Sequence, residues 1–117
     1  MPEMSVAREG CVAVCIEGNV YVVGGDGGDS ALKSAEVYDG SVGQWRALPD
    51  MSVPRINCAA VCIEGIVYVV GGEDGATKHA SVECYDPLAN EWRTLPSMGT
   101  ARSGCAAAVP VGEIYFA

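Results

Sequence analysis

The chain has 117 residues, the size of one ordinary domain, and half of them are apolar, which is enough to form a core. Its net charge is −8, with 15 acidic and 7 basic residues. This balance argues against nucleic acid and anionic membranes as partners, because binding phosphate requires clustered cations. No apolar run approaches the roughly 18 residues of a membrane span. The charge permits a basic peptide or protein partner, and it equally fits a surface that is acidic only for solubility.

One pattern recurs along the chain with a period of 47 residues. Segments 4–50 and 51–97 are identical at 26 of 47 positions, and segment 98–117 repeats only the first part of the pattern. A fixed period of this length is typical of an architecture built from stacked repeats. The sequence therefore predicts two complete structural units and one partial unit with these boundaries.

The first copy begins with a polar lead-in and the run Cys11–Ile16, which is apolar at every position. Such a strand should be covered on both faces, since a strand with one wet face would alternate. Glu17-Gly18-Asn19 has turn chemistry, and Val20–Val23 returns as a second strand. Gly24-Gly25 closes it, which suits a place where a neighbouring backbone comes too close for a Cβ, or where the chain turns sharply.

A polar loop follows each double glycine, and the two copies diverge most in this loop, 26–34 and 73–81. Two further strands then complete each copy before a Leu-Pro pair, where proline belongs just outside a strand. The predicted strands are, in chain order, Cys11–Ile16, Val20–Val23, Ala35–Asp39 and Gln44–Leu48, then Cys58–Ile63, Ile66–Val70, Val82–Asp86 and Glu91–Leu95.

Each copy thus predicts four short antiparallel strands joined in sequence, and the fold class is all-β. Copies that are apolar on both faces must stack face to face, and a twisted four-stranded sheet repeated in this way closes into a propeller. The chain supplies about 2.5 such units. We therefore expect its uncovered apolar faces to be met by the remaining blades of a longer chain or by self-association.

The six cysteines are expected to be free and to pack as small buried hydrophobes. Cys11 and Cys15 lie on one face of a strand about 13 Å apart, too far for a disulfide, and the same holds for Cys58 and Cys62. The only histidine, His79, is near neither pair in the sequence, so a zinc site is not predicted. Reduced cysteines predict a cytoplasmic location.

The repeated marks of the chain resemble the kelch repeat. They are an arginine, a double glycine, a Tyr-Asp pair and a tryptophan, which recur together at one offset. In this sequence they are Arg8, Gly24-Gly25, Tyr38-Asp39 and Trp45, then Arg55, Gly71-Gly72, Tyr85-Asp86 and Trp92, and Arg102 in the third copy. The resemblance covers essentially the whole chain from Met4 onward, and it implies the four-stranded blades of an incomplete kelch-type β-propeller.

Two kinds of residue pair recur in both full copies and are interpreted as structural. The rings of an aromatic pair can meet on adjacent strands and should pack one blade against the next. An Arg–Glu pair should form a partly buried ion pair that fixes the first strand against the third. The pairs are Tyr38 with Trp45, Tyr85 with Trp92, Arg8 with Glu36, and Arg55 with Glu83.

In kelch propellers the partner-binding mouth is formed by residues just after the repeated arginine and just after the double glycine. The resemblance therefore implies a site on loops that vary over a repeated framework. Its residues here are Glu9, Ile56, Asn57 and Ser103 after the arginines, and Asp26, Glu73 and Asp74 after the glycines. Better-known binders often carry Arg or Tyr there, whereas acids dominate in this chain. A basic partner and merely solvated acids are equal alternatives.

Some kelch propellers are enzymes, including copper oxidases and sugar mutarotases, but the sequence offers no catalytic set. A single histidine cannot supply a copper-binding pair, and all five tyrosines belong to the repeat. The acids of the two polar loops fall short of the roughly 6–8 oxygens that calcium prefers. We expect no catalytic residue, no metal and no cofactor.

The predicted function is a protein-interaction module, similar to the kelch substrate-recognition or scaffold domains of ubiquitin-ligase adaptors and cytoskeletal proteins. Two alternatives stay open. The chain could be part of a kelch-propeller enzyme or lectin that acts on a small molecule or sugar, or a truncated fragment without a function of its own.

Overall fold

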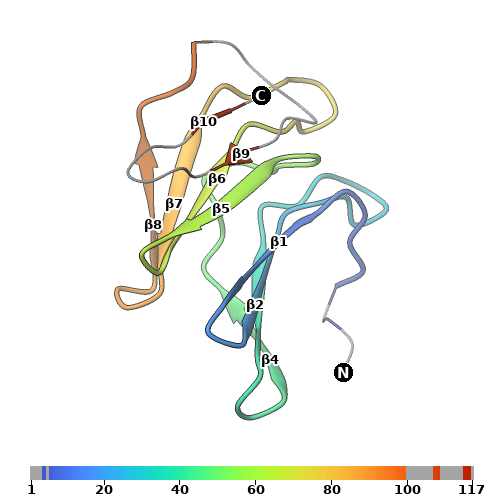
Figure 1. Ribbon diagram of the computed structural model, residues 1–117. Helices are drawn as coiled ribbons and strands as arrows, with labels where there is room; N and C mark the ends of the chain where they lie inside the picture. Colours follow the sequence, from blue (N-terminus) through green and yellow to red (C-terminus); the bar gives the residue numbers. More distant parts are fainter. Residues whose placement is uncertain (1–3, 5, 100–106, 109–114, 117) are drawn as a thin grey trace.

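A computed structural model describes residues 4, 6–99, 107–108 and 115–116. These residues form ten strands in three antiparallel sheets (Figure 1), and no helix among them could span a membrane. The first sheet contains β1 (Val12–Ile16), β2 (Asn19–Val23), β3 (Ala35–Asp39) and β4 (Gln44–Leu48). The second contains β5 (Ala59–Ile63), β6 (Ile66–Val70), β7 (Val82–Asp86) and β8 (Glu91–Leu95). The third pairs β9 (Ala107–Ala108) with β10 (Tyr115–Phe116).

Both four-stranded sheets are meanders in which the strand order follows the chain. Five strands have their predicted bounds, and β1, β2 and β5 differ from the prediction by one residue at their first end. The two-residue turn between β1 and β2 has φ of 49° at Glu17 and 82° at Gly18, and Glu64 and Gly65 repeat it between β5 and β6. Positive φ at both positions is the conformation that matches the twist of a tight hairpin.

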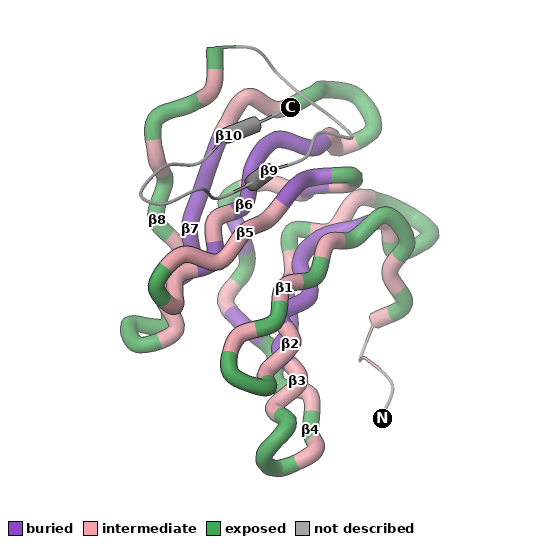
Figure 2. The backbone as a smooth tube through the Cα atoms, in the orientation of Figure 1, coloured by how far each residue is buried: buried purple, intermediate pink, exposed green. Residues whose placement is uncertain are grey.

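The core lies between the two four-stranded sheets, where one face of the first packs on one face of the second (Figure 2). Val37 and Val69, at its centre, are fully buried. Two contacts tie the sheets at their aromatic residues: the rings of Tyr21 and Tyr85 lie 6.2 Å apart, and Trp92 Nε1 donates to the Pro49 carbonyl at 2.7 Å. The predicted aromatic pair of the second copy therefore lies at the contact between sheets.

The first double glycine brings backbone from the two sheets together. A Cβ added to Gly24 would lie 2.3 Å from the carbonyl oxygen of Arg55, and the Gly25 N–H donates to that same oxygen at 2.7 Å. In the second copy, a Cβ on Gly72 would lie 2.9 Å from the Ile56 carbonyl oxygen. The close approach predicted from the sequence is present, and it lies directly beside Arg55.

The expectation that the first strand is covered on both faces is wrong for β1. Val12, Val14 and Ile16 are half-buried, whereas Ala13 and Cys15 are exposed. The first three pack toward the second sheet. Among the described residues no sheet lies against the other face, so it meets water. An apolar strand sequence indicates which residues tolerate burial, but they are buried only where another sheet packs against them.

The cysteines also differ in burial between the two copies. Cys58 and Cys84 are buried and Cys62 is half-buried, but Cys11 and Cys15 are exposed, which corrects the prediction that all of them pack inside. All five are free thiols, and Cys105 lies outside the described residues. The exposed pair lies in the first copy, which lacks the cover that the first sheet gives to the second.

In the native protein we expect a maleimide to label Cys11 and Cys15 at least about tenfold faster than Cys58 and Cys84. Burial raises the pKa of the Cys84 thiol and so lowers its thiolate fraction, and it also shields the sulfur. Mass spectrometry of peptides after short exposures measures each rate, with urea-unfolded protein as the control. Equal native rates at all four positions would contradict the assignment.

Candidate partner-binding site

The site rests on a buried arginine side chain that precedes the first strand of each four-stranded sheet, and Arg55 shows the arrangement most fully. Its side chain is completely buried, and Nη2 lies 2.8 Å from the Oε2 atom of Glu83. Nε donates to the same carboxylate at 3.2 Å, and Nη1 donates to the carbonyls of Gly71 at 2.6 Å and Ser81 at 3.1 Å. Nη2 also donates to the Ser81 hydroxyl at 2.9 Å. All five guanidinium N–H groups are therefore used.

Arg8 makes the same five bonds in the first sheet. It pairs with Glu36, with a closest N–O distance of 3.1 Å, and donates to the carbonyls of Gly24 and Ser34 and to the Ser34 hydroxyl. Both predicted ion pairs are present. The structure adds that each arginine holds the two ends of the divergent polar loop, because one of its carbonyl partners precedes the loop and the other is the last residue of the loop. The framework thereby fixes the base of a loop whose sequence is free to vary.

The residues after the arginines lie beside those after the double glycines. Glu9 and Asp26 exchange backbone hydrogen bonds of 3.0 and 2.7 Å, and Ile56 and Glu73 exchange bonds of 2.7 and 2.9 Å. The Asn57 N–H donates to the Gly10 carbonyl at 2.9 Å and joins the two sets. Four predicted site residues and Gly10 line one open depression of about 470 Å³, the loop-side depression: Glu9, Asp26, Ile56 and Asn57.

Two predicted site residues stand apart from this depression. Glu73 is joined to it by its backbone bonds to Ile56, and Asp74 follows Glu73 in the polar loop. Ser103 and Arg102 lie outside the described residues. Gly10, which the sequence did not single out, belongs to the site because a Cβ there would lie 3.0 Å from side-chain atoms of both Ile56 and Asn57.

The family model described as the kelch motif matches residues 7–52 and 54–99. The chain belongs to the kelch-repeat family. Its two four-stranded sheets are therefore kelch blades, and kelch repeats of this kind generally serve protein interaction. A solved structure titled "Structure of YjhT", a kelch-type propeller protein, superimposes with a TM-score of 0.82 at 23% identity. The match covers 99% of this chain and 35% of that one, and no curated protein matches the sequence.

The acids of the kelch loops partly serve the loops themselves. Asp26 Oδ1 accepts the Gly28 N–H at 2.8 Å. Asp74 Oδ1 accepts the N–H groups of Thr77 at 2.8 Å and Ala76 at 2.9 Å, and these bonds, Thr77 first, hold the pKa of Asp74 below its usual value. The carboxylate is therefore charged at neutral pH while it shapes its own turn.

His79 has a structural contact that sequence reasoning missed. Its Nε2 lies 2.8 Å from the Pro54 carbonyl, and since a carbonyl can only accept, Nε2 carries the proton in this bond. The histidine thus connects the polar loop of the second blade to the segment before Arg55. No local signal indicates a bond between residues 25 positions apart. Among the described residues, no three His, Cys, Asp or Glu side chains gather as metal ligands would.

Proposed function

We propose that the chain is a protein-interaction module that binds a Lys- or Arg-bearing segment of a partner at its loop-side depression. The observation that carries this proposal is the joining of Glu9 and Asp26 with Ile56 and Asn57 around one open surface. Two carboxylates beside a half-buried isoleucine suit a basic segment with an apolar contact. The arginine-clamped loop bases supply a rigid scaffold, so little ordering cost accompanies binding.

Catalysis is not part of this proposal. In the described part of the chain the one histidine is bonded to a carbonyl, and the depression is lined by acids, an amide, an isoleucine and a glycine. This set lacks a nucleophile with an adjacent base. The five free thiols favour a reducing, cytoplasmic setting. Substrate recognition for a ubiquitin ligase and scaffolding at the cytoskeleton are the two roles that the kelch family suggests for such a module.

Reversing charge at the depression should weaken partner binding about tenfold and abolish its sensitivity to salt. The variant is Glu9→Lys, in the depression, with Glu73→Lys, which lies beside it as the backbone partner of Ile56. Asp26 and Asp74 are left intact because their carboxylates hold the loops. A single surface charge contributes little alone, but replacing two attractions with two repulsions is measurable, and screening by salt should weaken the wild-type complex. Pulldown at low and high salt with quantitative mass spectrometry measures the effect.

The matched control is Glu91→Lys with Asp50→Lys, which alters the net charge equally at exposed positions outside the depression. If both double variants lose the same partners, net charge alone governs binding and the site is wrong. If neither variant loses a partner, the acids are only solvated, and the loop-side depression is not the binding surface.

A further inference from the structure

A second open depression lies at the other end of the same strands, where β1 ends and β2 begins. This turn-side groove has a volume of about 330 Å³ and lies between the β1–β2 turn of the first blade and the β5–β6 and β7–β8 turns of the second. Its apolar lining is Ile16, Tyr21, Ile66, Pro87 and Leu88. Four residue steps of a strand separate it from the loop-side depression, about 13 Å, so the two surfaces are distinct.

The two blades differ at the positions that border this groove. In the first blade the Gly40 N–H donates to Asn19 Oδ1 at 3.3 Å, which links two neighbouring turns. The corresponding residues of the second blade are Pro87 and Ile66. Proline has no backbone N–H and the isoleucine side chain has no acceptor, so the donor and the acceptor are replaced together by apolar groups. The change converts a polar link between turns into an apolar wall of the groove.

Leu88 adds to this wall a side chain that the fold does not need. It is fully exposed, and the first blade makes the same turn with Ser41 in its place. The turn is held by Asp86, whose Oδ1 accepts the Leu88 N–H at 3.0 Å, as Asp39 accepts the Ser41 N–H at 2.9 Å. The backbone under the leucine is therefore fixed in advance. Only the leucine side chain would then lose freedom on contact with a partner, which keeps the ordering cost of binding small.

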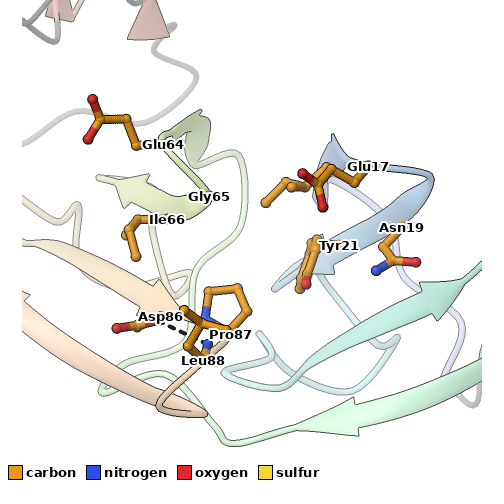
Figure 3. Close-up of a pocket in the computed structure, with 10 residues that line it drawn as sticks. Glu17, Asn19, Tyr21, Glu64, Gly65, Ile66, Asp86, Pro87 and Leu88 are labelled. Atoms are coloured by element: carbon orange, nitrogen blue, oxygen red, sulfur yellow. Dashed lines mark hydrogen bonds between the residues drawn. The ribbon is translucent and has the colours of Figure 1, made fainter.

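The charged side chains that line the groove are all acidic. Glu17, Glu64 and Asp86 are among the lining residues, and no lining side chain is basic. Figure 3 shows Tyr21 and Glu17 on the first blade facing Pro87 and Leu88 on the second, while Glu64 points away from the gap. Arg46 is not among the lining residues, although its positive charge acts on the hydroxyl groups of Tyr21 and Tyr85. A ligand with positive charge beside an apolar group matches this arrangement, and a second copy of this chain, at net charge −8, does not.

The geometry points to a second interaction surface: the turn-side groove binds a short segment of a partner protein in which one bulky apolar residue is flanked by Lys or Arg. The apolar side chain enters between Tyr21 and Leu88, and the flanking bases lie toward Glu17. The volume is at the low end of ligand sites, which suits one or two side chains and not a large ligand. This surface is independent of the proposed function at the loop-side depression.

The test uses fluorescein-labelled octapeptides with a central leucine between pairs of lysines, titrated against the full chain by fluorescence anisotropy. Leu88→Ser, which restores the first-blade residue, should weaken binding about tenfold, since the burial of one leucine side chain is lost. Val42→Ser is the matched control, because Val42 is also exposed and lies on the corresponding turn of the first blade. It should change the affinity less than about twofold. Replacing the peptide leucine with serine, or its lysines with glutamates, should remove binding.

Three outcomes would overturn the inference. They are no binding up to about 1 mM peptide, equal binding by Leu88→Ser, and equal binding of the leucine and serine peptides, which would indicate charge alone. Sedimentation in which Leu88→Ser dissociates an oligomer while no peptide binds would assign the groove to a second copy instead. The Glu9→Lys with Glu73→Lys variant should retain peptide binding here, so failure at one surface leaves the other standing.

Discussion

Arg55→Met is expected to destabilise the protein by about 3–5 kcal/mol, the range for removing one partner of a buried ion pair. The Glu83 carboxylate, almost fully buried, would keep only the bonds from the Ser52 N–H and hydroxyl. The carbonyls of Gly71 and Ser81 would lose the Arg55 donor, and the Ser81 carbonyl would keep the Gly71 N–H at 3.1 Å. Methionine fills a similar volume, so the loss reports charge and hydrogen bonding more than packing.

Urea unfolding followed by tryptophan fluorescence measures this loss, and the chain contains a matched control. Arg93 and Glu91 form an ion pair at 3.3 Å whose side chains are 61% and 56% exposed. Arg93→Met should cost at most about 1 kcal/mol, because exposed pairs are screened by water. A cost below about 1 kcal/mol for Arg55→Met would remove the structural role assigned to the ion pair.

Substitution of Glu83, the partner of Arg55, distinguishes the cost of an unpaired buried charge from the cost of lost packing. Glu83→Gln, a smaller change, should also destabilise the fold, and Arg55→Met combined with Glu83→Gln should cost less than the sum of the two single changes. The reason is that the double variant leaves no buried charge without a partner. Strict additivity would mean that Arg55 acts through its carbonyl partners and not through the carboxylate. If Arg55→Met alone fails to fold, the Glu83→Gln measurement still tests the pair.

The sequence predicted the framework well because the same pattern of framework residues occurs in both full copies. The strands, the Arg–Glu pairs and the double glycines recur at one offset, so each position is supported by its counterpart, and a binding function would not require that regularity. Whether a strand face is covered could not be predicted in this way. The same apolar pattern leaves Cys15 exposed in β1 and Cys62 half-buried in β5, because burial depends on the neighbouring sheet and not on the strand itself.

The residues of the loop-side depression could be predicted from the sequence, but the turn-side groove could be found only from the structure. The loop-side residues follow repeated marks, so their proximity could be expected. The turn-side groove carries no such mark. Its signal was the joint change of Asn19 and Gly40 to Ile66 and Pro87, two differences among many between the copies. Only the hydrogen bond between Asn19 and Gly40 shows that these two changes belong together.

Gly24→Ala is expected to destabilise the protein by about 3 kcal/mol through two separate costs. The first is the backbone conformation: φ at Gly24 is 68°, a left-handed region that costs a residue with a Cβ about 1–2 kcal/mol. The second is steric. The new methyl would lie 2.3 Å from the Arg55 carbonyl oxygen, which is backbone of the second blade and cannot rotate away. Relief requires the blades to separate, a form of overpacking that costs about 1–3 kcal/mol.

Gly65→Ala isolates the first of these costs. Its φ is 79°, and a Cβ added there meets nothing within 4 Å, so only the backbone conformation is penalised. The difference between the two variants in urea unfolding therefore measures the steric contact between blades, and we expect Gly24→Ala to be worse by about 2 kcal/mol. Separation of the blades by Gly24→Ala should also expose Trp92, which donates to the Pro49 carbonyl between the blades. The fluorescence of the folded protein should then shift to the red. Equal destabilisation by the two substitutions, with unchanged fluorescence, would show that the blades yield at no cost and that the double glycine serves the turn alone.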